Sequence, residues 1–457
     1  MAMNPTRRGF LIRTAAVGWA FLGRGVSALF PVGRQNNSTD SIHSGQSAVT
    51  HGPFLGHLTS TSAMVWARCS TPGSYRLTAR GTGADLVVTA EAASENDRCV
   101  VWQLTGLQAE RRYSYEVSYQ DQPALRDENA FFVTPPVDDA PRVTRLAIGS
   151  CAREDAESAA VWRRMSALDP HVTVLLGDTP YIDSMELDVQ RTRYAEFAAV
   201  PDFASLLRNC PLYATWDDHD FGLNDSSDGR FLGDGERAGK NNARQAFVEY
   251  HANPSYGEGN QGVYTKFRQG GVEVFLLDTR YFAGTEPSPV AVDQPTLLGK
   301  RQWEWLQREL QASTAPFKLL ASGMVWNGAV RPGKLDCWET YSWEREALFH
   351  FIGQERIPGV VLVGGDVHRT RILQYDTTDT AGYPLTELVT SPIHESVIDA
   401  ANAPHPALIH DSGEPHAFLL LTVDTTVTPA ILMAQFQNAA GRELYSMTLS
   451  AAELSAV

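Results

Sequence analysis

The chain lacks an excess of positive charge, a disulfide-rich composition and any long apolar run. Its 457 residues carry a formal net charge of -15, which argues against a nucleic-acid-binding surface, because such a surface needs clustered Lys and Arg. The 5 cysteines do not make a disulfide scaffold in a chain this long, and an odd number leaves at least one unpaired. No segment has about 20 uninterrupted apolar residues, so we expect no stable membrane span. The hydrophobic content of 43% is ordinary for a globular protein, and the length suggests two domains.

Residues 1–30 resemble a twin-arginine export signal. Thr6 to Leu11 reads TRRGFL, and the apolar run that follows is interrupted by glycines and by Arg24. Such a signal is recognised by a translocase and is not part of the fold. The alternative is a basic amphipathic tail. We expect the twin-arginine translocase to export the chain to the periplasm, the cell surface or the medium, with a possible cleavage site at Val26 to Ala28. Residues 31–50 are polar and predict a disordered spacer.

Residues 51–135 predict a small all-β sandwich of the immunoglobulin or fibronectin type. Short runs such as SAMVWARCS and RRYSYEVSYQ are rich in Val, Tyr, Trp and Thr and are separated by turn residues. Cys69 closes one predicted strand and Cys99 opens a later one. The pattern is compatible with a disulfide between them, and equally with two buried free thiols.

Residues 142–450 follow a proline-rich linker and predict an α/β domain. Predicted strands such as HVTVLLGD and GVVLVGGDVHRTRIL alternate with predicted helices such as KRQWEWLQRELQAS, and this alternation is typical of layered α/β folds. No repeat of fixed period is visible.

Metal-ligating side chains stand at the ends of several of these strands. If the sheet is mostly parallel, such ends converge on one rim, where open α/β sheets bind ligands. One Asp at a strand end is usually a helix cap, but a whole set of Asp, His, Cys and Tyr indicates a metal cluster. The segments concerned are GSC with Cys151, LGDTPY with Asp178 and Tyr181, TWDDHD with Asp217, Asp218 and His219, LDTR with Asp278 and Arg280, and GGDVH with Asp366 and His368.

The ligand types favour a ferric ion beside a harder divalent ion. Thiol and phenol have free pKa values of about 8.5 and 10, so only a strongly charged ion binds them as thiolate and phenolate. The predicted ferric ligands are Cys151, Asp178, Tyr181 and His368. The predicted ligands of the second ion are Asp178 as the bridge, Asp218 and Asp366, with Asp217 as a further candidate ligand.

Together these motifs resemble those of PhoD-type alkaline phosphatases, a branch of the calcineurin-like metallophosphoesterases. The resemblance covers nearly the whole chain and implies a four-layer αββα catalytic domain that hydrolyses phosphate monoesters and diesters with Fe3+ and Ca2+. It implies that Cys151, Asp178, Tyr181 and His368 hold the iron and that His219 takes the place of the catalytic histidine. Asp366 replaces a histidine of the last motif, and oxygen in place of nitrogen favours Ca2+.

The pattern leaves two roles open for each candidate substrate-binding residue. Arg280 is predicted to stabilise charge on the phosphate, or alternatively to form a salt bridge with Asp278 or Asp217. Asn224 is predicted to contact phosphate, or to be a loop cap. Asn327 is predicted to bind phosphate or calcium where related enzymes have a further histidine, or to be a turn residue. His394 is expected to be structural, and Asp183 to lie outside the site.

Two other functions are compatible with parts of the pattern, and a third is disfavoured. A phospholipase D-like hydrolase or another phosphodiesterase would carry the same motifs and differ in pocket shape. An exported glycan-binding protein with a structural metal site would need closed coordination, and His219 and Arg280 argue against it. A serine-based alkaline phosphatase is disfavoured, because no strand end presents a serine beside a base.

Overall fold

The computed structural model describes residues 48–120, 127–156, 158–227, 239–328, 330–331 and 333–456. Contacts divide the chain into Met1–Gly45 and Gln46–Val457, and the fold is that of the second unit. The predicted export signal, residues 1–30, and most of the spacer, residues 31–50, lie outside the described residues.

The first part of this unit is all-β, as the sequence predicts. Alternating burial along its strands, for example along β5, sends every second side chain into the interior. That interior contains Tyr75, Trp102 and Phe132. One sheet has the order β1-β2-β5, formed by β1 (Val49–Leu58), β2 (Ser62–Cys69) and β5 (Cys99–Thr105). The other has the order β4-β3-β6-β7, formed by β4 (Leu86–Ala92), β3 (Gly73–Arg80), β6 (Arg112–Tyr119) and β7 (Phe131–Val133).

The disulfide considered between Cys69 and Cys99 is not formed, and both residues are buried free thiols. Cys99 pairs with Arg68 across β2 and β5, so Cys69 is one residue out of register with it. Successive side chains on a strand point to opposite faces. Cys69 therefore packs inside the sandwich, whereas Cys99 belongs to the larger core on the other face.

The second part contains two mixed sheets rather than one. The first has the order β10-β9-β8-β18-β19-β20, formed by β10 (Leu212–Thr215), β9 (Val172–Leu176), β8 (Val143–Gly149), β18 (Ala417–Asp424), β19 (Ile431–Asn438) and β20 (Glu443–Ser450). The second has the order β11-β12-β13-β14-β16-β15-β17, formed by β11 (Thr265–Gln269), β12 (Val272–Leu276), β13 (Phe317–Ala321), β14 (Val360–Gly364), β16 (Leu385–Val389), β15 (Thr370–Tyr375) and β17 (Leu408–Ser412). Strands β8, β9 and β10 are parallel, as are β12, β13, β14 and β16. The central strands are buried along their whole length, which is typical of sheets covered on both faces.

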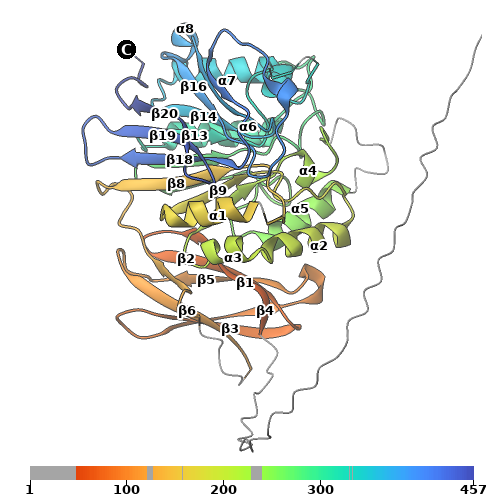
Figure 1. Ribbon diagram of the computed structural model, residues 1–457, viewed down its shortest axis with the longest axis vertical. Helices are drawn as coiled ribbons and strands as arrows, with labels where there is room; N and C mark the ends of the chain where they lie inside the picture. Colours follow the sequence, from red (N-terminus) through yellow and green to blue (C-terminus); the bar gives the residue numbers. More distant parts are fainter. Residues whose placement is uncertain are drawn as a thin grey trace, which may run out of the picture. The chain divides into compact units, whose positions relative to one another are not determined.

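Helices cover these sheets. They are α1 (Ser158–Ala167), α2 (Leu187–Ala198), α3 (Pro201–Leu207), α4 (Asp218–Phe221), α5 (Gly239–Tyr250), α6 (Gly299–Ala312), α7 (Ser342–Gln354) and α8 (Thr378–Ala381), with short 3-10 helices at Ser94–Asn96, Trp338–Tyr341 and Asp399–Ala401. Helix α1 packs on α3, and α2 on α5. Figure 1 shows α1, α2 and α3 between the all-β part and the strands of the first mixed sheet.

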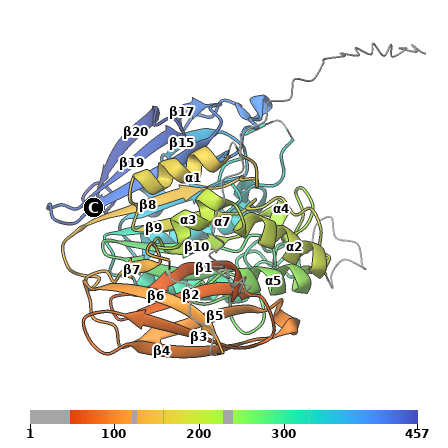
Figure 2. The same cartoon turned by 60° about the horizontal axis from the view of Figure 1, so that its bottom comes forward.

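The all-β part and the α/β part share one hydrophobic core. Phe54 of β1 and Trp66 of β2 belong to the same buried cluster as the central strands, and Trp66 donates a hydrogen bond from Nε1 to the carbonyl of Glu249 at 2.7 Å. Tyr213 of β10 accepts a hydrogen bond from the backbone N–H of Leu58. Figure 2 shows β1 beside β10, in agreement with their contacts.

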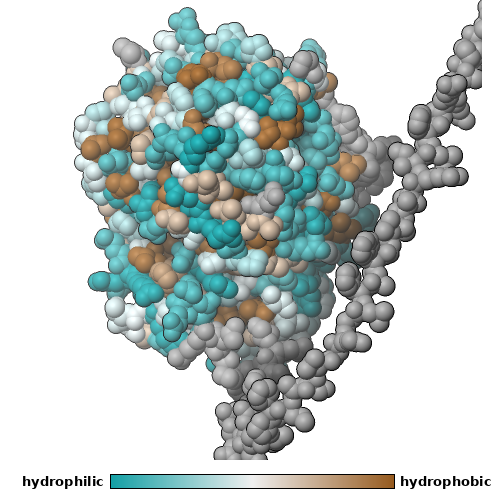
Figure 3. Space-filling view, in the orientation of Figure 1, coloured by the Kyte–Doolittle hydropathy of each residue, from teal (hydrophilic) through white to brown (hydrophobic). Residues whose placement is uncertain are grey.

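The face of the molecule shown in Figure 3 is mostly hydrophilic, with apolar residues in small scattered groups. Among the described residues, no helix has the length and apolar character needed to cross a membrane.

Candidate metal centre

The carboxyl ends of parallel strands from both sheets supply the candidate site. In the first sheet, β8, β9 and β10 end shortly before Cys151, Asp178 and Asp218. In the second, β12 and β14 end shortly before Arg280 and Asp366. The rim predicted for one sheet is therefore assembled from two, and the topology still brings these strand ends together.

Left-handed backbone is concentrated at these strand ends. Outside glycine this conformation costs roughly 1 kcal/mol or more, so it persists where the surrounding structure enforces it. Gly177 has a φ of 89°, and a Cβ there would lie 2.2 Å from the backbone nitrogen of Asp217, so only glycine lets the ends of β9 and β10 approach so closely. The site residues with φ of 52° to 66° are Cys151, Asp178, Asp183, Asp225, Asp366 and His368.

The four residues predicted to hold iron are brought together. Ligand atoms of Cys151, Asp178 and His368 lie within 4.8 Å of one another, and the Sγ of Cys151 is 3.6 Å from Oδ2 of Asp178. The hydroxyl of Tyr181 is 2.7 Å from Nε2 of His368. The other ring nitrogen of His368 is buried and has no hydrogen-bond partner among the described residues.

His394, expected from the sequence to be structural, also reaches this group. Its Nε2 is 2.9 Å from the hydroxyl of Tyr181, and its Nδ1 accepts a hydrogen bond from the N–H of Ser396. The Nε2 of the neutral ring must then carry the proton and donate it to the phenol oxygen. A donor aimed at that oxygen favours the phenolate form of Tyr181. His394 could have been found from the sequence, because it follows the end of the apolar strand β16, as the other site residues follow theirs.

The electrostatics of the group favour bound cations. Burial and the negative charge of Asp178 raise the pKa of the Cys151 thiol well above its ordinary value. Burial and then Cys151 raise the pKa of Tyr181, and burial followed by Asp218 raises that of Asp178. A bound cation would lower these pKa values instead, because it stabilises thiolate, phenolate and carboxylate together. The donor set therefore fits a highly charged ion.

A second ligand group shares Asp178 with the first. Ligand atoms of Asp178, Asp218 and His219 lie within 4.8 Å of one another, and a further group joins Asp218 with Asp225 and Asp336. Asp178 thus belongs to both groups, which is the position that the predicted bridging role would need. Neither Asp225 nor Asp336 was predicted from the sequence, since both lie in loops without ligand spacing.

Asp366 lines the same cavity, but its carboxylate is paired with a lysine. The Nζ of Lys334 lies 2.7 Å from Oδ2 of Asp366. The structure thus places the predicted calcium ligand Asp366 at the site and adds a cationic partner that the sequence did not reveal.

His219 is oriented by Asp183, which the sequence analysis placed outside the site. The Nδ1 of His219 is 2.5 Å from Oδ1 of Asp183. Burial would lower the pKa of His219, but the hydrogen bond to Asp183 and the charge of Asp218 outweigh it and raise the pKa above its ordinary value. Because Nδ1 is engaged, Nε2 is the ring nitrogen left to act in the cavity that His219 lines.

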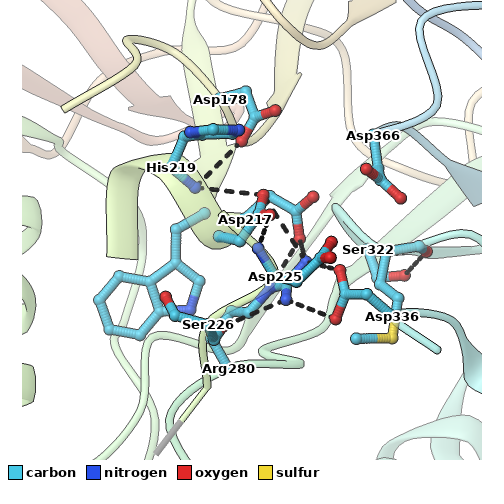
Figure 4. Close-up of polar contacts among 12 residues, drawn as sticks. Asp178, Asp217, His219, Asp225, Ser226, Arg280, Ser322, Asp336 and Asp366 are labelled. Atoms are coloured by element: carbon cyan, nitrogen blue, oxygen red, sulfur yellow. Dashed lines mark hydrogen bonds and ion pairs between the residues drawn. The ribbon is translucent and has the colours of Figure 1, made fainter. Parts of the chain in front are cut away.

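Arg280 is not among the residues that line the cavity, so the geometry does not support its predicted contact with the phosphate. Its side chain is 0% exposed and is held by Asp217, by Asp336 at 2.8 Å and by the carbonyl of Ser226. Figure 4 shows it between these groups. The alternative of a salt bridge to Asp217 is confirmed. The carboxylate of Asp278 instead accepts the backbone N–H of Arg280 at 3.0 Å.

The remaining candidates separate clearly. Oδ1 of Asp217 accepts a hydrogen bond from Arg280, and its Oδ2 has no hydrogen-bond partner among the described residues. Asn327 is fully buried, and its Nδ2 donates to Glu387 at 3.1 Å. It does not line the cavity, so the turn reading fits better than phosphate binding. Asn224 is exposed and does line it.

The cavity over these groups is small, with a volume of about 70 Å³. Polar and charged residues line it together with a small apolar side formed by Val367, Ile398 and Ala401. Arg331 and Lys334, both overlooked in the sequence, supply its positive charge. A polar cavity with cationic side chains beside acidic ligand groups suits a phosphate ester.

Two family models match the chain. The model described as PhoD-like phosphatase matches residues 146–416, and the model described as Domain of unknown function (DUF7800) matches residues 46–137. Over 200 residues the chain is 28% identical to a protein named Alkaline phosphatase D from Bacillus subtilis (strain 168). That match covers 39% of this chain and 34% of the relative, so it spans about a third of the relative's length.

Two solved structures resemble the fold over most of its length. A structure of PhoD superposes with a TM-score of 0.68 at 19% identity and covers 88% of this chain and 93% of that one. The purple acid phosphatase PPD1 from yellow lupin (Lupinus luteus) seeds superposes with a TM-score of 0.67 at 13% identity, covering 87% and 74%. At these identities the likeness concerns the fold. The family model, which spans more than half of the chain and all the ligand groups, carries the assignment: this chain belongs to the PhoD-like phosphatase family.

Proposed function

We propose that the chain is a metal-dependent hydrolase of phosphate monoesters and diesters. The observation that carries the proposal is the pair of ligand groups that share Asp178, one with Cys151, Tyr181 and His368 and the other with Asp218. The relative named Alkaline phosphatase D supports the same class of reaction.

The residues present fit two different ions. Cys151, Asp178, Tyr181 and His368 would hold Fe3+, since thiolate and phenolate suit it. The oxygen ligands Asp178, Asp218 and Asp366 would hold Ca2+. Bound cations of this kind supply positive charge to the phosphate and lower the pKa of a water from 15.7 to about 7.

The protein side chains would position the ester and move one proton. Asn224 and Arg331 line the cavity and would bind phosphate oxygens, with Arg331 taking the role that the sequence analysis gave to Arg280. His219, oriented by Asp183, would donate a proton from Nε2 to the leaving alcohol. The apolar side at Val367, Ile398 and Ala401 would hold the organic part of the ester.

The test is a hydrolysis panel of monoesters and diesters, with metal analysis of the same sample. The proposal expects hydrolysis that depends on metal, and iron in the active protein. A diester rate far above the monoester rate would favour the alternative of a phospholipase D-like hydrolase or another phosphodiesterase. Absence of hydrolysis across the panel would overturn the proposal.

Three further points belong to the same proposal. The two mixed sheets and their covering helices support a four-layer αββα arrangement for a catalytic domain at residues 142–450. The separate family matches support a distinct domain at residues 51–135. The TRRGFL segment of residues 1–30 supports export by the twin-arginine translocase to the periplasm, the cell surface or the medium.

A further inference from the structure

Lys334 lies among the acidic residues of the second ligand group. It follows Gly333, which has a φ of 78°, in the loop before the 3-10 helix Trp338–Tyr341. Its side chain is only 3% exposed. The Nζ lies 2.7 Å from Oδ2 of Asp366, 3.5 Å from Oδ1 of Asp225 and 3.9 Å from Oδ2 of Asp336.

The carboxylates around Lys334 are those that would bind a divalent ion. Asp225 and Asp336 form a ligand group with Asp218, and Asp366 was predicted as a calcium ligand from the sequence. Arg280 already neutralises part of this charge through its ion pair with Asp336. The Lys334 ammonium supplies the positive charge nearest to Asp366.

The Lys334 ammonium and a calcium ion would compete for the same carboxylate oxygens. Calcium takes 6 to 8 oxygen ligands at 2.3–2.6 Å. An ammonium can donate three hydrogen bonds, and Lys334 donates to Oδ1 of Asp366 at 3.0 Å and to Oδ1 of Asp225 at 3.5 Å. An ammonium hydrogen-bonded to the Asp366 carboxylate and a calcium ion bound to the same carboxylate would bring two positive charges close together in a buried site. The two occupants therefore exclude each other.

We propose that Lys334 is a built-in monovalent occupant of the second cation site, and that a divalent ion must displace it to bind. This inference rests on the proposed function, which places that ion at Asp218 and Asp366. Lys334 also lines the cavity, so the displaced ammonium has space to enter on the side where the phosphate would bind. Calcium binding would thus turn Lys334 from a carboxylate partner into a partner for the substrate anion.

The first experiment measures calcium binding to the full chain by calorimetry, after treatment with a calcium chelator. Removing the competing charge with Lys334→Met should tighten calcium binding by about 10-fold or more, within the usual range of coupling between sites. Lys334→Arg keeps the charge. Lys300→Met removes an exposed lysine on α6, 69% exposed. Both controls should bind calcium within about 2-fold of the wild type.

Calcium binding to Lys334→Met that is equal to or weaker than wild-type binding would overturn the inference. Hydrolysis of a phosphate ester by the wild type is measured separately and tests the proposed function. A wild type that hydrolyses the ester while its calcium affinity ignores Lys334 would leave the proposed function intact and refute only the displacement.

A second measurement needs no variant and holds even if Lys334→Met does not fold. The wild-type protein is acetylated with acetic anhydride, with and without saturating calcium, and the modified lysines are located by peptide mass spectrometry. Acetylation of Lys334 should rise with calcium, while that of Lys300 should not change. Equal protection of Lys334 in both samples would contradict its displacement.

Discussion

At Tyr181 a single phenol oxygen meets two imidazoles, His368 at 2.7 Å and His394 at 2.9 Å. The proton on Nε2 of His394 points at this oxygen, and such a donor stabilises a phenolate. Phenolate and thiolate donate charge to Fe3+, so the purified protein should be visibly coloured.

Tyr181→Phe should weaken or shift the absorption band and lower activity. Changes around a metal site commonly cost 10- to 100-fold, and loss of a direct ligand should cost at least that much. Cys151→Ala should behave in the same way. The measurement is the visible spectrum with iron content and hydrolysis rate, and Tyr194→Phe is the matched control, because that buried phenol lies outside the ligand groups. A colourless, iron-free protein with full activity would contradict the iron assignment.

Asp183→Asn should reduce the turnover number by about 10-fold or more, because His219 loses the carboxylate that orients it and stabilises its protonated form. Iron content and colour should stay unchanged, since Asp183 is in none of the ligand groups found among the described residues. Steady-state kinetics and metal analysis test this, with Asp188→Asn in α2 as an exposed control. Equal turnover of the two variants would show that the contact is incidental. The sequence had suggested a small effect for Asp183.

The residue types at strand ends pointed to the side chains that form the candidate ligand groups, but not to the cationic residues of the cavity. Cys, Asp and His together at strand ends, as at Cys151, Asp178 and His368, are an unusual set. Arg331 and Lys334, in contrast, lie in a loop whose path depends on tertiary packing. Arg280 follows a strand end, so from the sequence it looked suitable for binding the phosphate. Its burial beside Asp336 could not be read from a pattern along the chain.

At the scale of elements, the strand predicted from GVVLVGGDVHRTRIL is two strands. β14 ends at Gly364 and β15 begins at Thr370, and the loop between them carries Asp366 and His368. Both strands are apolar, so period and composition do not mark the break. Helices α2 and α3 were not predicted, because α2 carries no clear apolar stripe and α3 is very short.

Gly177→Ala should destabilise the junction of β9 and β10 by about 2 kcal/mol or more, since it combines a left-handed backbone with a clash against Asp217. Metal content should fall as well, because Asp178 follows directly. Urea unfolding and metal analysis provide the measurement. Gly83→Ala is the control, since a Cβ at Gly83 meets nothing within 4 Å. Equal stability of both variants would contradict the argument.

His251, after the end of α5, should make the protein less stable in mild acid. Burial lowers its pKa from 6.5 to about 4, so between these values the unfolded chain binds a proton that the folded chain does not. Stability therefore falls as the pH drops from about 6.5 to about 4, by roughly 3 kcal/mol in total. Free energies of unfolding at pH 7 and pH 5 should differ less in His251→Gln than in the wild type. An unchanged difference would show that His251 does not contribute.

At the scale of the whole molecule, the shared core ties the all-β part to the α/β part. Deleting residues 52–134 should lower solubility and stability, because it uncovers Phe203 and Tyr213, which pack against β1. The metal ligands all lie outside the deletion, so the soluble fraction should keep its iron. Calorimetry of the full chain should show one melting transition. Two separate transitions, or a well-folded deletion variant without metal, would contradict this division of roles.

The left-handed backbone at Cys151, Asp178, Asp366 and His368 restricts how the site can be re-engineered for another ion. Besides glycine, asparagine, aspartate and histidine adopt this conformation most readily. An exchange of Asp178, Asp366 or His368 to glutamate or to a β-branched residue would therefore strain the loop as well as change the ligand. Asp366→His and Asp178→Asn remain the least strained exchanges. The choice of metal in this scaffold is thus limited by main-chain geometry as well as by donor chemistry. A library for new metal specificity at Asp178, Asp366 and His368 would need only the residue types that tolerate a left-handed backbone.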